Sequence, residues 1–415
     1  MARLRIKQVG PIQEGLQGES EFLEFKGVTL FIGDQGSGKS TVAKLYSTLS
    51  WLEKALMRGD FSVAQFNNRN GFENQLKYQG IDGYLSDQSE IEYQGEAYTI
   101  LYKGKKNKGK SKKEITATLK KKASYAYPQI MYVPAERNFV SSIAKATSIP
   151  FLPAPLFTFL AEYKDAQEAT REIIDLPVSG VKFRYNSSSD TAYILGEDYE
   201  VDLLKASSGF QSMTPLYLVT QYLSNNIDKA PSIGTNRLSL KQKEQLQKLE
   251  EQTSIAWLKD WASQKLEDQL QYNSFINVVE ELEQNLYPSS QKQLLFSLIA
   301  SNNEREADRL VLTTHSLYLL GYLGLCIKAQ QLKTLLSQLP EQEQVIQKAK
   351  LEEIVPLEAA LNLEQLSLYQ LNTDGSIENI QSSRGLPSED NDLNIAMMEL
   401  NDLFTELLEL QQEWK

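Results

Sequence analysis

The chain has 415 residues, 41% of them hydrophobic, which is enough for a large core and for two or three domains. Its net charge of −11 is unevenly distributed, because residues 103–122 hold ten lysines and one acid and leave −20 on the rest. The single cysteine, Cys326, excludes an intrachain disulfide and indicates a cytoplasmic compartment. The sequence has no apolar signal region at its N-terminus and no run of roughly 18 uncharged apolar residues, so we expect neither secretion nor membrane contact.

The N-terminal part alternates between strand and helix patterns. Residues 1–33 predict two strands, the second an apolar run that Gly33 ends, and residues 41–56 predict a helix with one apolar face. Residues 91–122 predict antiparallel strands around a lysine-rich tip, and residues 129–133 predict a short buried strand.

The remainder of the chain continues this alternation. We expect a hairpin over residues 181–204, a solvated helical insertion over 225–272 and a buried strand over 310–312. After residue 340 the chain is acidic and helical, apart from a hairpin at Asp374–Gly375. The last helix carries one apolar stripe: Leu393, Met397, Leu400, Phe404 and Leu407. Strands that alternate with helices in this way predict an α/β fold with a mixed sheet.

A glycine-rich loop follows the second predicted strand and precedes the first predicted helix. It matches the phosphate-loop pattern, in which backbone N–H groups and a helix N-terminus surround phosphate oxygens. Lys39 should reach the β- and γ-phosphates of ATP, and Ser40 should bind Mg²⁺. The predicted nucleotide-binding residues are Gly33, Asp34, Gln35, Gly36, Ser37, Gly38, Lys39, Ser40 and Thr41.

Three further segments carry candidate chemistry. A serine- and glycine-rich segment at 206–212 precedes a helix that we expect to start near Met213, and its simplest alternative interpretation is a helix N-cap. An apolar run at 275–279 ends in Glu280 and Glu281, although the same residues would also suit an acidic amphipathic helix. A third run ends in His315, the only histidine of the chain. In the first segment, the candidates for a γ-phosphate contact are Ser207, Ser208, Gly209 and Gln211.

These motifs occur in the order found in ABC-type ATPases, and the chain resembles the OLD/RecF-like class of prokaryotic defence systems. The resemblance implies that Glu280 holds Mg²⁺, that Glu281 orients the attacking water, and that His315 contacts the γ-phosphate or that water. Leu282 and Tyr287 depart from the pattern, where proline and histidine are usual. A P-A-E-R segment ends at Arg137 in the expected place of the glutamine loop, and which residue acts there is open.

The resemblance also implies how the chain is divided into domains and how two copies would associate. Residues 1–330 would form the ATPase head, with an antiparallel β-subdomain and helical insertions, and residues 331–415 a C-terminal helical region for oligomer or partner contacts. Two heads would sandwich ATP head to tail, and such dimers could join into a ring. Roughly 165 residues without heptads separate the phosphate loop from the 206–212 segment, so a long coiled-coil arm is not expected.

The overall build is similar to that of the AriA-type ATPases of PARIS anti-phage systems. This similarity implies a scaffold and sensor that holds a separate TOPRIM nuclease, of the AriB type, and releases it on sensing a phage protein. A Septu-type ATPase paired with an HNH nuclease and a RecF-like repair ATPase remain alternatives. The lysines of Lys103–Lys113 could bind DNA or an acidic phage protein, or could only protect a sheet edge from pairing.

Overall fold

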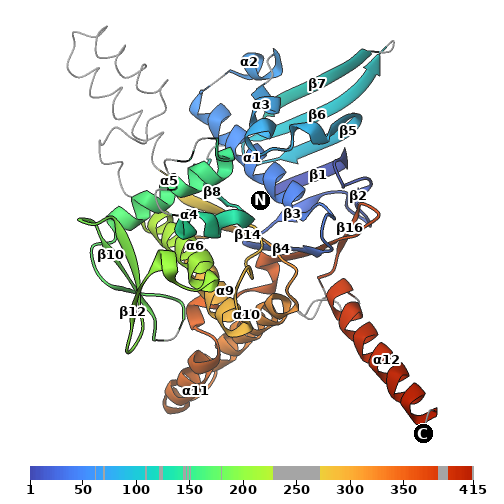
Figure 1. The fold of residues 1–415 in the computed structure, drawn as a ribbon. Coiled ribbons are helices and arrows are strands. Elements are labelled where there is room, and N and C mark those ends of the chain that lie inside the picture. The colour runs from blue at the N-terminus through green and yellow to red at the C-terminus, as the bar shows by residue number, and fades with distance from the viewer. Residues whose placement is uncertain are drawn as a thin grey trace, which may run out of the picture.

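The computed structural model shows an α/β molecule built on three sheets (Figure 1). It describes the chain apart from residues 61, 69–70, 108–109, 121–124, 144–145, 147–148, 150, 179, 228–271, 382–390 and 414–415. The helical insertion expected over 225–272 therefore lies almost entirely outside the described residues.

The central sheet has seven strands in the order β2-β16-β15-β4-β14-β13-β8. Five neighbouring strands are parallel: β15 (Leu366–Leu371), β4 (Val28–Gly33), β14 (Arg309–Thr313), β13 (Ser274–Val279) and β8 (Pro128–Val133). Their apolar runs are buried on both faces, as expected for parallel strands covered on either side. The predicted strands at 28–32, 129–133, 275–279 and 310–312 are confirmed, and an acidic helix at 275–279 is excluded.

The C-terminal hairpin belongs to this sheet. It consists of β15 and β16 (Ser376–Asn379), with the turn at Asp374–Gly375 as predicted, and β16 pairs with β2 (Gly15–Leu16). Because β15 lies directly beside β4, the hairpin of residues 366–379 belongs to the same sheet as strands from the first half of the chain.

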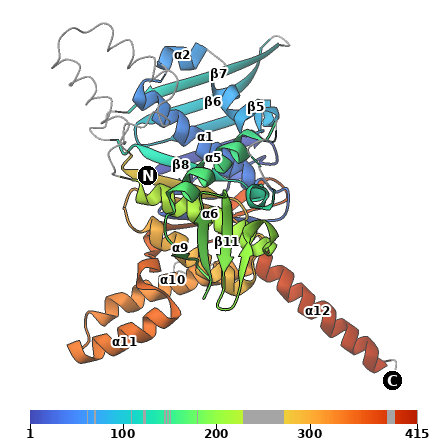
Figure 2. The same cartoon turned by 60° about the vertical axis from the view of Figure 1, so that its left-hand side comes forward.

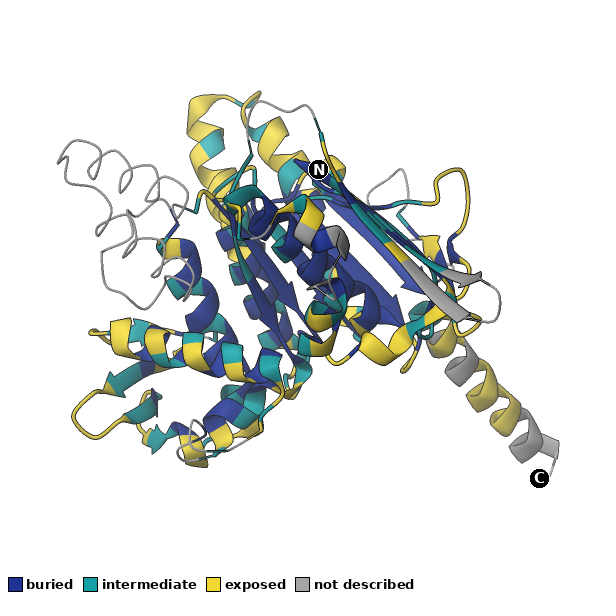
Figure 3. Cartoon of the chain, turned by 90° about the horizontal axis from the view of Figure 1, so that it is seen from above, coloured by how far each residue is buried: buried dark blue, intermediate teal, exposed yellow. Residues whose placement is uncertain are grey.

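A second sheet has five antiparallel strands and packs against the first helix. Its order is β3 (Leu23–Phe25), β1 (Ala2–Val9), β5 (Leu85–Gln94), β6 (Tyr98–Asn107) and β7 (Lys110–Leu119). Helix α1 (Lys39–Arg58) packs between this sheet and the central one (Figure 3), and its apolar face joins Phe31 and Ile91 in one core. The predicted β-subdomain and the predicted helix over 41–56 are confirmed. The short helices α2 (Val63–Asn68) and α3 (Gly71–Tyr78) follow α1.

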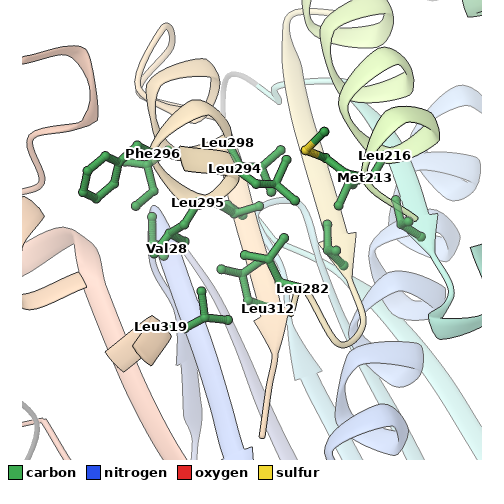
Figure 4. Close-up of a cluster of buried hydrophobic side chains, with 14 of the residues drawn as sticks. Val28, Met213, Leu216, Leu282, Leu294, Leu295, Phe296, Leu298, Leu312 and Leu319 are labelled. Atoms are coloured by element: carbon green, nitrogen blue, oxygen red, sulfur yellow. The ribbon is translucent and has the colours of Figure 1, made fainter. Parts of the chain in front are cut away.

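Helices cover the other face of the central sheet. They are α4 (Phe139–Ser142), α5 (Ala154–Ala169), α6 (Ser208–Asn225), α9 (Pro288–Asn302) and α10 (Leu317–Leu336). Figure 4 shows Met213 of α6 and Leu294 of α9 gathered over Val28 and Leu312 of the sheet. A small antiparallel sheet lies between α5 and α6 in the chain: β9 (Ile174–Asp175), β10 (Lys182–Asn186), β11 (Thr191–Leu195) and β12 (Glu200–Asp202). The expected fold class, α/β with a mixed central sheet, is confirmed.

Two helices extend from this body in Figure 2: α11 (Glu341–Ile354) and α12 (Asp392–Glu413). On α12, Leu393 packs partly against the core, whereas Phe404 and Leu407 are 62% and 63% exposed. The predicted amphipathic stripe thus lies on a helix whose outer part is exposed. Among the described residues, no helix is both long and apolar enough to cross a membrane.

Helix α1 is tied to the β-subdomain by a buried carboxylate. Glu53 accepts hydrogen bonds from the backbone N–H groups of Ala97 and Tyr98, at 2.6 and 2.9 Å, and from the Tyr93 hydroxyl at 2.9 Å. The neighbouring Gly95 leaves room for it, because a Cβ at this position would lie 2.2 Å from Glu53 Oε2. The helix that begins at the phosphate loop is thereby anchored to the β5–β6 turn.

Gly95→Ala should therefore lower the free energy of unfolding by about 2 kcal/mol, because the new methyl group displaces a buried carboxylate from its donors. Urea denaturation measures this change. Gly83→Ala is the matched control, since a Cβ there would meet no heavy atom within 4 Å. Equal stability of the two variants would show that Glu53 does not anchor the turn.

Candidate nucleotide site

The candidate residues gather where three neighbouring parallel strands end. Strands β4, β14 and β13 lie side by side, so their carboxyl ends meet at one edge of the sheet. The phosphate loop follows β4, the pair Glu280–Glu281 follows β13, and Thr314–His315 follows β14. In open α/β sheets this edge is the usual place for a ligand.

The phosphate loop depends on its glycines. Gly33, Gly36 and Gly38 have φ values of 137°, 81° and 107°, in the region that L side chains rarely adopt. At Gly33 a Cβ would also lie 2.2 Å from the carbonyl oxygen of Leu371. Asp34 and Gln35 are exposed, Thr41 is buried in the first turn of α1, and the buried Ser37 hydroxyl has no hydrogen-bond partner among the described residues. The loop presents the N-terminus of α1 at the sheet edge, an arrangement that suits phosphate.

Lys39 is held against this loop. Its Nζ donates to the carbonyl oxygens of Gly33 and Asp34 at 2.8 and 2.7 Å, and the side chain is 6% exposed. Burial lowers the pKa of Lys39, while the charges of Glu281, Glu283 and other nearby acids oppose that shift. The ammonium group of Lys39 therefore lies close enough to the acids after β13 to interact with their charges.

Glu280 is a buried carboxylate suited to a cation. It is 5% exposed, its N–H donates to the carbonyl oxygen of Val133 at 3.0 Å, and its Oε1 has no hydrogen-bond partner in the described part of the chain. Ser40 is exposed in the first turn of α1. Carboxylate and hydroxyl oxygens are the ligands that Mg²⁺ prefers, so Glu280 and Ser40 fit the predicted metal role.

Glu281 has a constrained backbone. Its φ is 45°, and its N–H donates to Thr313 Oγ1 at 3.1 Å. The guanidinium of Arg137 donates to the carbonyl oxygens of Glu280 and Glu281, both at 2.6 Å. Arg137 is completely buried, and burial lowers its pKa to about 10 despite the acids around it.

A third acid, Glu283, forms hydrogen bonds between the segment after β13 and the segment after β14. The carboxylate of Glu283 accepts from the Thr314 hydroxyl at 2.8 Å and from the backbone N–H of His315 at 2.6 Å. The His315 side chain is exposed at the site. Sequence reasoning missed Glu283, although its position two residues after Glu281 was a usable signal, and it left the role of Arg137 open.

The 206–212 segment differs from its prediction in one respect. Helix α6 begins at Ser208 rather than near Met213, with Ser207 at the N-cap position but making no side-chain capping hydrogen bond. Ser207 and Ser208 are exposed, and a Cβ at position 209 would lie 3.0 Å from the carbonyl oxygen of Asn285, so Gly209 fits closely there. The Gln211 amide nitrogen donates to the carbonyl oxygens of Leu203 and Leu204, at 3.1 and 3.0 Å, so its predicted nucleotide contact remains a prediction.

Comparison with known proteins finds similarity at the level of solved structures. No protein-family model matches the chain, and no curated protein matches it. Among solved structures, the SMC head domain from Thermotoga maritima aligns with 77% of this chain and 90% of that chain, at 11% sequence identity and a TM-score of 0.35. A likeness this remote says nothing about activity.

Proposed function

We propose that this protein binds ATP with Mg²⁺ and hydrolyses it in the manner of ABC-type ATPases. The observation that carries the proposal is the meeting of Lys39, the Glu280–Glu281 pair and the His315 segment at adjacent strand ends. A glycine-rich loop, a buried carboxylate and a second acid are the groups that phosphoryl transfer to water requires.

Each group has a distinct task in this reaction. Lys39 and the loop N–H groups hold the β- and γ-phosphates, and Ser40 and Glu280 hold Mg²⁺, which offsets phosphate charge when bound. Glu281 orients a water molecule toward the γ-phosphorus. The bond to the β–γ bridging oxygen breaks as the water oxygen bonds to phosphorus, giving ADP and phosphate. His315, positioned through Glu283, contacts the γ-phosphate or the attacking water.

The site is proposed to be completed by a second copy of the chain. Ser207 and Ser208 are exposed at the start of α6, which packs against α5, α9 and the segment before α4. Their hydroxyls and the following backbone N–H groups form a helix N-terminus suited to the γ-phosphate of a facing head. A two-fold arrangement would then give two equivalent sites, each built from both copies.

Ser208→Arg should block hydrolysis while ATP still binds at Lys39 of the same chain. The reason is that a large, positively charged side chain would lie between the two copies, where Ser208 is proposed to face the γ-phosphate. Phosphate release and nucleotide binding measure the two effects separately. The control is Ser187→Arg, at an exposed serine in the β10–β11 turn. Mixing Ser208→Arg with Lys39→Ala chains should restore activity, since each mixed dimer contains one intact site. Full hydrolysis by Ser208→Arg alone would refute the shared site.

For the biological role we propose a sensor and scaffold in anti-phage defence, as in AriA-type ATPases, that controls a separate nuclease. The support is the resemblance of the P-A-E-R segment, the 206–212 segment and the acids after β13 to that family. Capture of a nuclease encoded beside this chain, and its release when a phage protein is added, would test it. ATP-dependent DNA binding without any partner protein would instead favour the RecF-like alternative, and capture of an HNH nuclease the Septu-type one.

The lysine-rich hairpin supports recognition of a polyanion. Strands β6 and β7 lie side by side (Figure 1), and they pair in register up to the tip, with Lys105 opposite Lys112. Residues 103–122 hold ten lysines and one acid, and such a concentration of positive charge attracts polyanions. DNA and an acidic protein both present such anions.

Replacing Lys105, Lys106, Lys110, Lys112 and Lys113 by serine should weaken DNA binding and flatten its salt dependence. The slope of the logarithm of the binding constant against the logarithm of the salt concentration should become less steep, by about 0.9 for each DNA phosphate that a lysine no longer neutralises. Titration of duplex DNA and of an acidic protein at several salt concentrations measures this. ATP hydrolysis should be unchanged, and Lys348→Ser with Lys350→Ser on α11 serves as control. Unchanged affinity for both polyanions would favour protection of the sheet edge.

A further inference from the structure

Arg137 lies beneath the turn that carries the acids after β13. Its NH1 donates to the carbonyl oxygen of Glu280 at 2.6 Å, and its NH2 donates to those of Glu281 at 2.6 Å and Leu282 at 3.4 Å. The side chain is 0% exposed, so these hydrogen bonds are made away from solvent. A lysine could not reproduce this fork of donors.

The turn needs such support. Glu281 adopts a φ of 45°, a conformation that is unfavourable for a residue with a side chain. Thr313 Oγ1 accepts from the Glu281 N–H while Arg137 donates to the Glu281 carbonyl oxygen, so the backbone is held on both sides. The direction in which the Glu281 carboxylate leaves the chain therefore depends on Arg137.

The segment of Arg137 also contacts the helix that begins at Ser208. Arg137 lies in the short helix η2 (Ala135–Asn138), which runs into α4, and both pack against α6. Ser141 Oγ donates to the carbonyl oxygen of Gln211. One continuous segment, residues 135–142, thus connects the turn of Glu281 with the helix whose first residues would face another copy.

We propose that Arg137 is a positioning residue that fixes the Glu281 carboxylate for hydrolysis and ties its turn to helix α6. The assignment rests on the ATPase function proposed above. Arg137 makes its hydrogen bonds to the turn rather than to the phosphate loop, so we expect it to affect turnover more than ATP binding.

The test compares Arg137→Lys and Arg137→Ala with the wild-type chain. We expect kcat to fall on the order of 10- to 100-fold in both, with KM for ATP changed less than about 3-fold, because a misplaced catalytic group affects turnover. Millimolar guanidinium should restore part of the activity of Arg137→Ala. Arg305→Ala is the control, since Arg305 is largely buried but donates to the Ser224 carbonyl oxygen and to Asp308, away from the turn.

Amide hydrogen exchange gives a readout that does not depend on activity. Exchange over residues 280–286 should accelerate in Arg137→Lys and stay unchanged in Arg305→Ala. If the wild-type chain hydrolyses no ATP, the proposed function fails, and unchanged exchange in Arg137→Lys would separately show that Arg137 does not hold the turn. Wild-type kcat in either folded variant, or an equal decrease in ATP binding and turnover, would overturn the proposal.

Discussion

Lys39→Ala is expected to lower the affinity for ATP at least about 100-fold, which corresponds to about 2.7 kcal/mol of binding free energy. Lys39 is the only side-chain cation in the phosphate loop, and the acids beside it would repel phosphate once its charge is removed. Hydrolysis should disappear together with binding. Equilibrium titration with a fluorescent ATP analogue measures the affinity.

The fold should tolerate this change. Burial disfavours the charged form of Lys39, and its two hydrogen bonds go to carbonyl oxygens of the loop itself, so we expect Tm to change by less than about 4 °C. Lys292→Ala is a suitable control, because Lys292 is half-buried near the start of α9. Wild-type affinity in folded Lys39→Ala would show that the loop is not the nucleotide site.

Glu281→Gln should slow hydrolysis at least about 100-fold while ATP still binds, because the amide keeps the shape of the side chain but cannot orient and deprotonate water as a carboxylate does. Bound ATP should then persist. Single-turnover assays with excess protein separate binding from the chemical step.

Glu304→Gln provides the matched control for this substitution. Glu304 lies between α9 and β14, at the amino end of that strand and therefore at the opposite edge of the sheet. Its replacement should leave turnover unchanged. If Glu281→Gln hydrolyses ATP at the wild-type rate, the acid that orients water is a different residue.

Much of the fold can be predicted from local patterns of residues in the sequence. Continuous apolar runs predicted β4, β13 and β14, and the glycine-rich loop predicted where α1 begins. The pairing of β15 with β4 could not be predicted in this way, because it joins residues more than 300 positions apart and leaves no local periodicity. Helix α6 starts earlier than expected, at Ser208, and Ser212 ahead of Met213 is buried in its packing, which overrides the weak helix propensity of serine.

The candidate site was predictable where a motif carries the chemistry, as at Lys39 and Glu280. It was not predictable where a side chain acts through backbone groups. Arg137 reaches carbonyl oxygens about 143 to 145 positions away, and Glu283 binds the backbone of His315. Such interactions depend on the tertiary arrangement, in which the ends of distant parallel strands meet.

We propose that two copies of this chain enclose ATP between them. The most direct test is the mass in solution of Glu281→Gln with ATP and Mg²⁺, determined by light scattering and compared with the same sample containing ADP. We expect a particle of at least twice the mass of one chain with ATP, and disappearance of that particle in the Lys39→Ala, Glu281→Gln double variant. A strict monomer that retains bound ATP would contradict it.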